Sequence, residues 1–386
     1  MEGVQVRIIS NEKGKGLFAL GSFKEGDTIF EEKPFICCQF SWNAEYGYSA
    51  CDNCLKPLET AEENVRRLSE KSNIILPYPE CCETKSELIT ECELCGVKYC
   101  THECKIQALQ RFHKSLCLHS RSKNHLHPLV QLNDTWKQLH YPPETATVML
   151  LARMVALINQ SNDKDNIRSI FSQFCHRTTN ETQEIAHNLL GEKFVGQIDI
   201  LRKTMQSVLN AEFVQDWFTP EGFKSLLALV GTNGQGIGTS AFSRWVKNVT
   251  NLELPDDQRM QVDKLIDKIY DDMEEVVGTF LNNEGSGLYT LQSTINHSCL
   301  PNAVVEFPYS NSTLVLKAIR DIEPEEEVCI AYLDECLLER SRHSRQKALS
   351  SQYLFICQCA RCLMQIEDPD VTSEEDDDDD HEDMSD

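Results

Sequence analysis

The stretch Asn296-His297-Ser298-Cys299-Leu300-Pro301-Asn302 places an amide, an imidazole and a thiol close together in a region of short apolar runs. Taken alone, Asn296-His297 also fits a polar pair whose hydrogen bonds are satisfied inside a core. Two further stretches have to be considered with it, residues 13–19 on its N-terminal side and residues 324–333 on its C-terminal side. The order of these stretches, with three clustered cysteines behind them, is the basis of the fold prediction.

The sequence around these stretches alternates between strand-like and helical patterns, which predicts an α+β fold. Short strands and turns are expected over residues 4–40 and again over 285–333, where brief apolar runs are separated by glycines and polar residues. Residues 128–230 repeat apolar side chains at helical spacing, so this part is expected to be mostly helical.

Two more elements are expected between the helical part and the second group of strands. The glycines at 231, 234, 236 and 238 predict a break in regular structure. A further helix is predicted over residues 255–282. Its apolar face is expected to consist of Leu265, Ile269, Met273, Val276, Val277 and Phe280.

Charge is distributed unevenly along the chain. The net charge of −24 includes 13 acidic and no basic residues from 367 to 386, so the rest of the chain carries −11. Such a run of like charge predicts a disordered, solubilising tail. The acidic body disfavours binding to the nucleic-acid backbone and favours a basic protein partner. No apolar stretch is long enough to cross a bilayer, so no membrane partner is expected.

The first of two cysteine clusters has the spacing of zinc ligands. It reads Cys51-x2-Cys54, then Cys92-x2-Cys95-x4-Cys100-x3-Cys104, then His113-x3-Cys117. Because no secretion signal is seen, the thiols are expected to stay reduced, and C-x2-C pairs on tight turns are typical of tetrahedral zinc. Eight ligands are enough for two closed sites of the structural kind.

This cluster resembles the MYND zinc finger, in which ligand pairs alternate between two metals. The resemblance implies one zinc bound by Cys51, Cys54, Cys100 and Cys104, and a second bound by Cys92, Cys95, His113 and Cys117. Residues 55–91 form a longer loop than the family usually has between these ligands. The loop contains Cys81 and Cys82, which remain the alternative to Cys51 and Cys54 at the first site.

The second cluster, Cys357-x-Cys359-x2-Cys362, has one ligand fewer than tetrahedral zinc requires. Cys299 is a candidate for the fourth ligand. A group of basic residues shortly before this cluster is interpreted as a solvated helix face rather than a nuclear-localisation signal. These residues are Arg340, Arg342, Arg345 and Lys347.

In their order along the chain, these stretches resemble the SET domain of protein-lysine methyltransferases. Interruption by a MYND finger is the arrangement of the SET and MYND domain-containing methyltransferases, and the resemblance covers about residues 4–365. It implies a SET-domain β-fold with a knot-like C-terminal crossing, interrupted by the finger and a helical insertion and followed by a cysteine-rich post-SET segment. The implied divisions are 1–50 for the N-terminal SET part, 51–117 for the finger, 118–230 for the helical insertion, 231–350 for the C-terminal SET core, 351–365 for the post-SET segment and 366–386 for the acidic tail.

The resemblance also implies which residues form the site. Tyr332 matches the catalytic tyrosine at the end of its strand, and Cys299 with Cys357, Cys359 and Cys362 completes a third zinc site. Tyr289 is assigned with equal weight to the lysine channel and to the core. The expected cofactors are S-adenosylmethionine and three zinc ions. The residues expected to bind S-adenosylmethionine are Lys13, Lys15, Gly16, Asn233, Asn296, His297, Tyr332 and Phe355.

The implied function is N-methylation of lysines on basic proteins such as histones or ribosomal proteins. The alternative is a catalytically silent adapter that docks proline-containing peptides through its finger. Loss of Tyr332, Asn296 or His297 would indicate the adapter, and all three are present. We expect a monomer that binds no specific nucleic acid, located in the cytoplasm with the nucleus as a second location.

Overall fold

The computed structural model describes residues 3–10, 13–121, 125–139, 147–177, 197–209 and 212–369. Its strands form one four-stranded sheet, two three-stranded sheets and a two-stranded ribbon. The strands are β1 (Val4–Ser10), β2 (Gly14–Ala19), β3 (Thr28–Glu32), β4 (Ile36–Gln39), β5 (Thr90–Glu91), β6 (Lys98–Tyr99), β7 (Gln235–Thr239), β8 (Asn283–Leu288), β9 (Asn296–His297), β10 (Ala303–Glu306), β11 (Leu314–Ala318) and β12 (Glu327–Ile330).

The four-stranded sheet brings together segments that are far apart in sequence. Its order is β1-β2-β12-β9. Strand β12 runs antiparallel to β2, opposite Leu17 and Phe18, and parallel to β9, with Cys329 opposite Asn296 and Ile330 opposite His297. The three stretches that decided the fold prediction are therefore neighbours in one sheet. The other sheets have the orders β10-β11-β3 and β4-β8-β7.

Helices form the other regular elements of the described chain. Within the described ranges, no helix is long and apolar enough to span a bilayer. The helices are α1 (Ala61–Leu68), α2 (His102–Ala108), α3 (Lys114–Leu116), α4 (Pro128–Leu139), α5 (Val148–Gln160), α6 (Lys164–Phe171), α8 (Ile198–Val208), α9 (Pro220–Asn233), α10 (Ala241–Thr250), α11 (Asp256–Val277), α12 (Glu335–Glu339), α13 (Arg342–Tyr353) and α14 (Ala360–Met364), with shorter turns that include η2 (Pro79–Cys82), η4 (Leu109–His113), η6 (Glu212–Phe218) and η7 (Gln292–Thr294).

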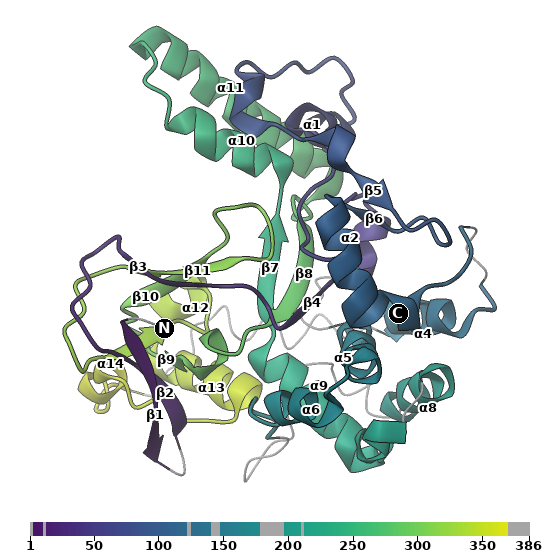
Figure 1. The fold of residues 1–386 in the computed structure, drawn as a ribbon. Coiled ribbons are helices and arrows are strands. Elements are labelled where there is room, and N and C mark those ends of the chain that lie inside the picture. Colours follow the sequence, from purple (N-terminus) through teal and green to yellow (C-terminus); the bar gives the residue numbers. More distant parts are fainter. Residues whose placement is uncertain are drawn as a thin grey trace, which may run out of the picture.

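Helices α4, α5, α6, α8 and α9 gather on one side of the molecule, as the helical spacing of residues 128–230 predicted (Figure 1). Helix α5 is buried almost all round, because its sequence is apolar on every face. It forms the centre of a core that also contains Trp136, Phe171 and Phe223. Strand β4 contributes Ile36 and Cys38 to the same core, so the helical layer packs directly against a sheet.

Two sequence expectations need correction. The predicted glycine break is instead the end of α9 followed by strand β7, which pairs antiparallel with β8. Strand pairing uses backbone atoms, so glycines do not prevent it, and Ile237 still enters the core. The helix predicted over 255–282 is α11, which ends at Val277 because Gly278 adopts a φ of 57°. Its buried residues are Val262, Ile266, Ile269 and Met273, whereas Val276 is exposed.

The long loop over residues 55–91 contains α1 and η2, which pack against α10 and α11. These elements form a helical lobe that projects from the sheets (Figure 1). The indole Nε1 of Trp245 donates to the Pro77 carbonyl at 2.9 Å, and Nδ2 of Asn248 donates to the Cys81 carbonyl at 2.7 Å. Cys81 and Cys82 are buried in the core of this lobe. The extra length of the loop is therefore used to build the lobe.

Candidate active site and zinc centres

Three groups of cysteine and histidine side chains converge in the structure. In each group the four potential ligand atoms lie within 4.8 Å of one another. These are the ligand sets that the resemblance implied. The first is Cys51, Cys54, Cys100 and Cys104, the second is Cys92, Cys95, His113 and Cys117, and the third is Cys299, Cys357, Cys359 and Cys362.

The spacing of the sulfur atoms fits zinc. A tetrahedral zinc with Zn–S bonds of about 2.3 Å places its sulfurs about 3.8 Å apart. The Sγ atoms of Cys54, Cys100 and Cys104 are 3.5 to 3.8 Å apart, and those of Cys299 and Cys362 are 3.6 Å apart. At the second group, Nε2 of His113 lies 3.5 Å from Sγ of Cys95. The donor sets therefore fit three zinc ions.

In the first group the structure brings Cys100 and Cys104 together with Cys51 and Cys54 rather than with Cys81 and Cys82. Cys51 and Cys54, on a tight turn, face Cys100 and Cys104 at the start of α2. Cys81 and Cys82 lie in η2 and contribute to the apolar core of the lobe. Burial raises the pKa of both of these thiols, as expected for core residues in their neutral form.

Metal analysis of the purified protein is expected to give three zinc ions per chain. Replacing Cys104 with serine removes a ligand of the first site and is expected to lower the count to two, because that site is then incomplete. The matched control is the Cys81→Ser, Cys82→Ser double variant, which should retain three. Atomic emission spectrometry measures the count. A control that loses zinc while Cys104→Ser retains it would overturn this ligand assignment.

The turn between β1 and β2 is tied to β9 and β12 by a polar network. Nζ of Lys13 pairs with the Glu327 carboxylate at 2.6 Å. The Asn296 amide donates both to Glu327, at 2.8 Å, and to the Lys15 carbonyl, at 2.9 Å. Gly16 lies against this network, because a Cβ there would be 3.1 Å from Asn296 Nδ2 and 3.1 Å from Glu327 Oε1. Four predicted site residues are thus brought together around Glu327.

A second group of predicted residues surrounds Tyr332. The Tyr332 ring centroid lies 5.5 Å from that of His297, 4.8 Å from that of Tyr353 and 6.3 Å from that of Phe355. The Tyr332 hydroxyl donates to the Ile295 carbonyl at 2.6 Å. Burial raises the pKa of Tyr332, so the phenol is protonated at neutral pH. The result is a half-buried aromatic cluster in which the Tyr332 hydroxyl is oriented by the Ile295 carbonyl and the Tyr353 hydroxyl donates to the Tyr332 carbonyl at 3.4 Å.

His297 joins the aromatic cluster to the third zinc group. Its Nδ1 accepts the backbone N–H of Tyr332 at 2.9 Å, so Nδ1 carries no proton. Burial lowers the pKa of His297 to about 4, and the ring is neutral at pH 7. The proton of the neutral ring is therefore on Nε2, which lies 3.3 Å from Sγ of Cys299.

Two predicted site residues, Asn233 and Tyr289, are buried. Both Nδ2 hydrogens of Asn233 are donated, to the carbonyls of Cys175 and Leu229, and its Oδ1 accepts the Cys175 N–H. Tyr289 is completely buried and donates its hydroxyl to the Ser312 carbonyl at 2.7 Å. Asn233 therefore has the surroundings of a positioning residue, and Tyr289 has those of a core residue. Direct cofactor contact by Asn233 and a channel role for Tyr289 stay predictions.

Three residues of this region were missed in the sequence. Glu327 lies in a run of three glutamates, and nothing in that run distinguishes it from Glu325 or Glu326. Tyr353 follows a polar helical segment and precedes Phe355, so an aromatic pair before the cysteines was the available signal. The third is Arg345, which was expected on a solvated helix face but is fully buried beside Cys299.

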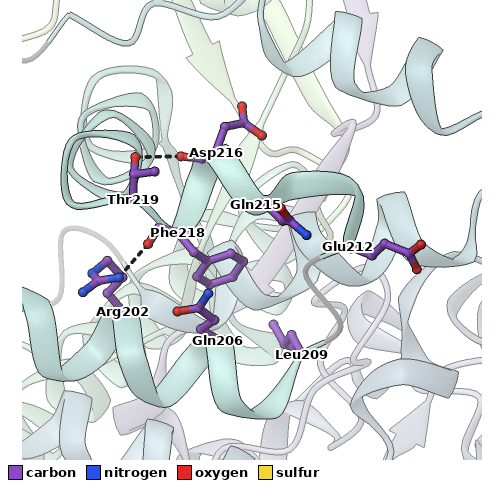
Figure 2. A pocket seen from close by; sticks show the side chains of 8 residues that line it. All are labelled: Arg202, Gln206, Leu209, Glu212, Gln215, Asp216, Phe218 and Thr219. Carbon is purple, nitrogen blue, oxygen red and sulfur yellow. Dashed lines mark hydrogen bonds between the residues drawn. The ribbon is translucent and has the colours of Figure 1, made fainter.

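A surface pocket lies away from these residues. It measures about 780 Å³ and is lined by residues of α8 and η6 with the start of α9 (Figure 2). Within it, Arg202 donates to the Phe218 carbonyl and the Thr219 hydroxyl donates to the Asp216 carbonyl. None of the predicted site residues lines this pocket.

Comparison with known proteins defines the class. A SET domain profile matches residues 14–333, which is most of the chain. The network around Asn296 and the cluster around Tyr332 both lie within this range. The chain therefore belongs to the SET domain family.

Relatives narrow the family further. The chain is 52% identical to "Protein-lysine N-trimethyltransferase SMYD5" of Homo sapiens over 96% of this chain and 89% of that protein, and 54% identical to that of Gallus gallus over the same shares. It belongs to the SMYD family of SET-domain methyltransferases. In the sequence, the loop over 55–91, residues 230–238 and the acidic tail resemble the fifth vertebrate member of this family in particular, and the identities to SMYD5 confirm that resemblance. The crystal structure of the SET domain of LSMT bound to lysine and AdoHcy aligns with a TM-score of 0.31 at 11% identity, covering 92% of this chain and 53% of that one.

Proposed function

We propose that this protein transfers methyl groups from S-adenosylmethionine to the ε-amino group of lysines in basic proteins, such as histones or ribosomal proteins. The observation that carries the proposal is the oriented hydroxyl of Tyr332 in an aromatic cluster next to the Asn296 network. Relatives over nearly the full length are named trimethyltransferases, so we propose up to three methyl groups per lysine.

The target lysine must lose its proton before it can react. A free lysine has a pKa of about 10.4, so only about one in a thousand or fewer is neutral at pH 7. An environment of aromatic rings lowers that pKa by desolvation, and the positive sulfonium of bound S-adenosylmethionine, which supplies the electrophilic methyl group, lowers it further. The rings of Tyr332, Tyr353 and Phe355 provide such an environment. The same ring faces attract a cation, which favours binding of the sulfonium.

Tyr332 is the proposed catalytic residue. Its hydroxyl is held by the Ile295 carbonyl and its backbone by His297, so the phenol oxygen has a fixed position. An oxygen at a fixed position can accept a hydrogen bond from the lysine amine and orient the nitrogen lone pair. Because the reaction is a direct displacement, positioning of the two reactants is the main contribution expected from the protein.

The remaining sequence assignments complete the proposal. Lys13, Lys15, Gly16, Asn296, His297 and Phe355 would bind the cofactor, with Asn233 acting through the backbone of Cys175. Residues 51–117 are assigned to a MYND finger and 351–365 to a post-SET segment, and the divisions at 50, 117, 230, 350 and 365 are kept. The parallel pairing of β9 with β12 supports the knot-like crossing.

Replacing Gly16 with alanine is expected to weaken binding of S-adenosylhomocysteine about tenfold, or about 1.4 kcal/mol. The new Cβ would lie 2.5 Å from Cδ1 of Ile9 and close to Asn296 and Glu327, so the proposed cofactor network must shift. Titration calorimetry measures the affinity. The matched control is Gly21→Ala, whose Cβ meets no atom within 4 Å and should leave the affinity unchanged. Equal affinities in the two variants would remove this network from the cofactor site.

Calorimetry of the wild-type protein also separates the enzyme from the adapter. The enzyme is expected to bind S-adenosylmethionine with the stoichiometry of one site per chain. An adapter is expected to bind a proline-containing peptide through its finger and not to bind S-adenosylmethionine. Absence of cofactor binding by the zinc-loaded protein would therefore favour the adapter.

Removing residues 370–386 is expected to raise the KM for a basic protein substrate several-fold and leave kcat unchanged, because an acidic tail raises the local concentration of a basic partner. The effect should decrease as salt is added, since screening weakens interactions between exposed charges. Steady-state kinetics at two salt concentrations measures both changes. An unchanged KM would return the tail to a purely solubilising role.

We further propose that the protein acts as a monomer, mainly in the cytoplasm and also in the nucleus. Light scattering and imaging of a tagged chain test these two assignments. A stable dimer or an exclusively nuclear signal would contradict them.

A further inference from the structure

Arg345 is a buried charge beside the third zinc group. It lies in α13 and is completely inaccessible to solvent. Its Nε donates to Sγ of Cys299 at 3.3 Å, and Nη2 lies 3.7 Å from Sγ of Cys362. Nη1 donates to the Arg340 carbonyl, and Nη2 also donates to Oε1 of Gln365. One guanidinium therefore contacts two of the four proposed ligand sulfurs.

The charge of the site explains why an arginine is found there. Four cysteine thiolates and one Zn²⁺ carry a net charge of −2, which is costly to bury unless it is compensated. The planar guanidinium offers N–H donors in a fixed fork and stays charged even when it is buried. Arg345 meets both needs, because its cation is next to the thiolates and its fork spans Cys299 and Cys362.

The same sulfur of Cys299 leads to Tyr332. Because Nδ1 of His297 accepts the Tyr332 N–H, the ring N–H is on Nε2, which donates to Sγ of Cys299 at 3.3 Å. A continuous series of hydrogen bonds thus runs from Arg345 to Cys299, then to His297, and then to the backbone of Tyr332. The rings of Tyr332 and His297 also lie near that of Phe355, which is two residues before the proposed ligand Cys357.

We propose that Arg345 is a positioning residue: it stabilises the third zinc site through Cys299 and Cys362 and, by way of His297, fixes the position of Tyr332. The predicted effect of Arg345 on catalysis rests on the proposed function, whereas its predicted effect on zinc binding does not. Removing the guanidinium should therefore loosen one of the three zinc ions and lower the rate of methyl transfer together.

The test compares Arg345→Met, which keeps the length of the side chain without its charge, with Arg345→Lys, which keeps the charge without the fork. Lys347→Met is the matched control, because Lys347 is exposed on the same helix. Zinc released to a coloured chelator is followed over time, and kcat and KM for the protein substrate are measured on the zinc-loaded protein. The thermal unfolding midpoint shows which variants are folded.

For Arg345→Met, one zinc equivalent of three is expected to leave about 10- to 100-fold faster, the effect typical of losing an outer-shell partner. We expect kcat to fall about tenfold or more with KM within about twofold, because the substrate-binding surface is unchanged. Arg345→Lys should be intermediate, and Lys347→Met should match the wild type.

Unchanged zinc release in both Arg345 variants would overturn the proposal. Faster release with an unchanged kcat would overturn the connection to Tyr332. If Arg345→Met does not fold, Arg345→Lys decides both points. If the wild type transfers no methyl group, the proposed function fails, and zinc release still decides whether Arg345 holds the third site.

Discussion

Replacing Tyr332 with phenylalanine is expected to lower kcat for lysine methylation by about 100-fold or more, within the usual range for removing a positioned catalytic group. The variant lacks the hydroxyl that is held by the Ile295 carbonyl, so the attacking amine has no partner at that position. The ring contacts with His297, Tyr353 and Phe355 are kept, so the fold should be intact. Steady-state kinetics and thermal unfolding measure the two properties.

Two other tyrosines provide controls for this result. Tyr309→Phe removes an exposed hydroxyl that contacts Glu31, and turnover should be unchanged. Tyr289→Phe removes the buried hydroxyl that donates to Ser312 and should affect stability more than rate. A large loss of kcat in Tyr289→Phe would instead assign that residue to the lysine channel. Near-normal turnover of Tyr332→Phe would contradict the role given to Tyr332.

Replacing Arg153 with methionine is expected to lower the free energy of unfolding by about 3–5 kcal/mol, the usual cost of removing one partner of a buried ion pair. Arg153 is only 6% exposed. Its guanidinium donates to the carbonyls of Cys37 and Asp52 and pairs with the Asp52 carboxylate. Without it, the Asp52 carboxylate loses this ion pair, and the carbonyls of Cys37 and Asp52 lose their donor.

The position of Arg153 explains why the effect should be large. It extends from α5 to β4 through Cys37 and to the Cys51–Cys54 turn through Asp52, and its guanidinium lies 4.3 Å from the Phe112 ring centroid. One side chain thus connects the helical layer, a sheet and the zinc-binding segment. Arg168→Met, which removes a pair with Asp216 at the surface, is the control, with an expected change below about 1 kcal/mol. Urea unfolding of the zinc-loaded variants measures both. Equal effects would contradict the anchoring role of Arg153.

The sequence predicted best those features that are encoded by neighbouring residues. The C-x2-C pairs and the spacing of His113 and Cys117 reflect local geometry, and the structure places all eight residues in two groups. The third group depends on Cys299, which is far from Cys357 in sequence, so only the resemblance to the SET domain could connect them. The pairing of strand β9 with strand β12 also joins segments that are not neighbours in sequence, so it too could be expected only from that resemblance.

Features set by tertiary packing were not predictable from the sequence. Helix α13 has polar residues on all faces, so nothing in the sequence indicates that Arg345 is buried against thiolates. In the sequence, Arg153 interrupts an apolar run, and its partner Asp52 lies about 100 residues earlier. Strand β7 is rich in glycine, and only its pairing with β8 makes it a strand. In each case the partner is a backbone or side chain distant in sequence.

Transfer of radiolabel to a protein is the direct test of methyl transfer at the site around Tyr332. Zinc-loaded protein is incubated with radiolabelled S-adenosylmethionine and a mixture of core histones and ribosomal proteins, with Tyr332→Phe in parallel. The proposal predicts a discrete labelled protein band with the wild type that is absent with the variant, and mass spectrometry of that band should place the methyl groups on lysine. Label on no protein, or equal label with both enzymes, would contradict methyl transfer at the site around Tyr332.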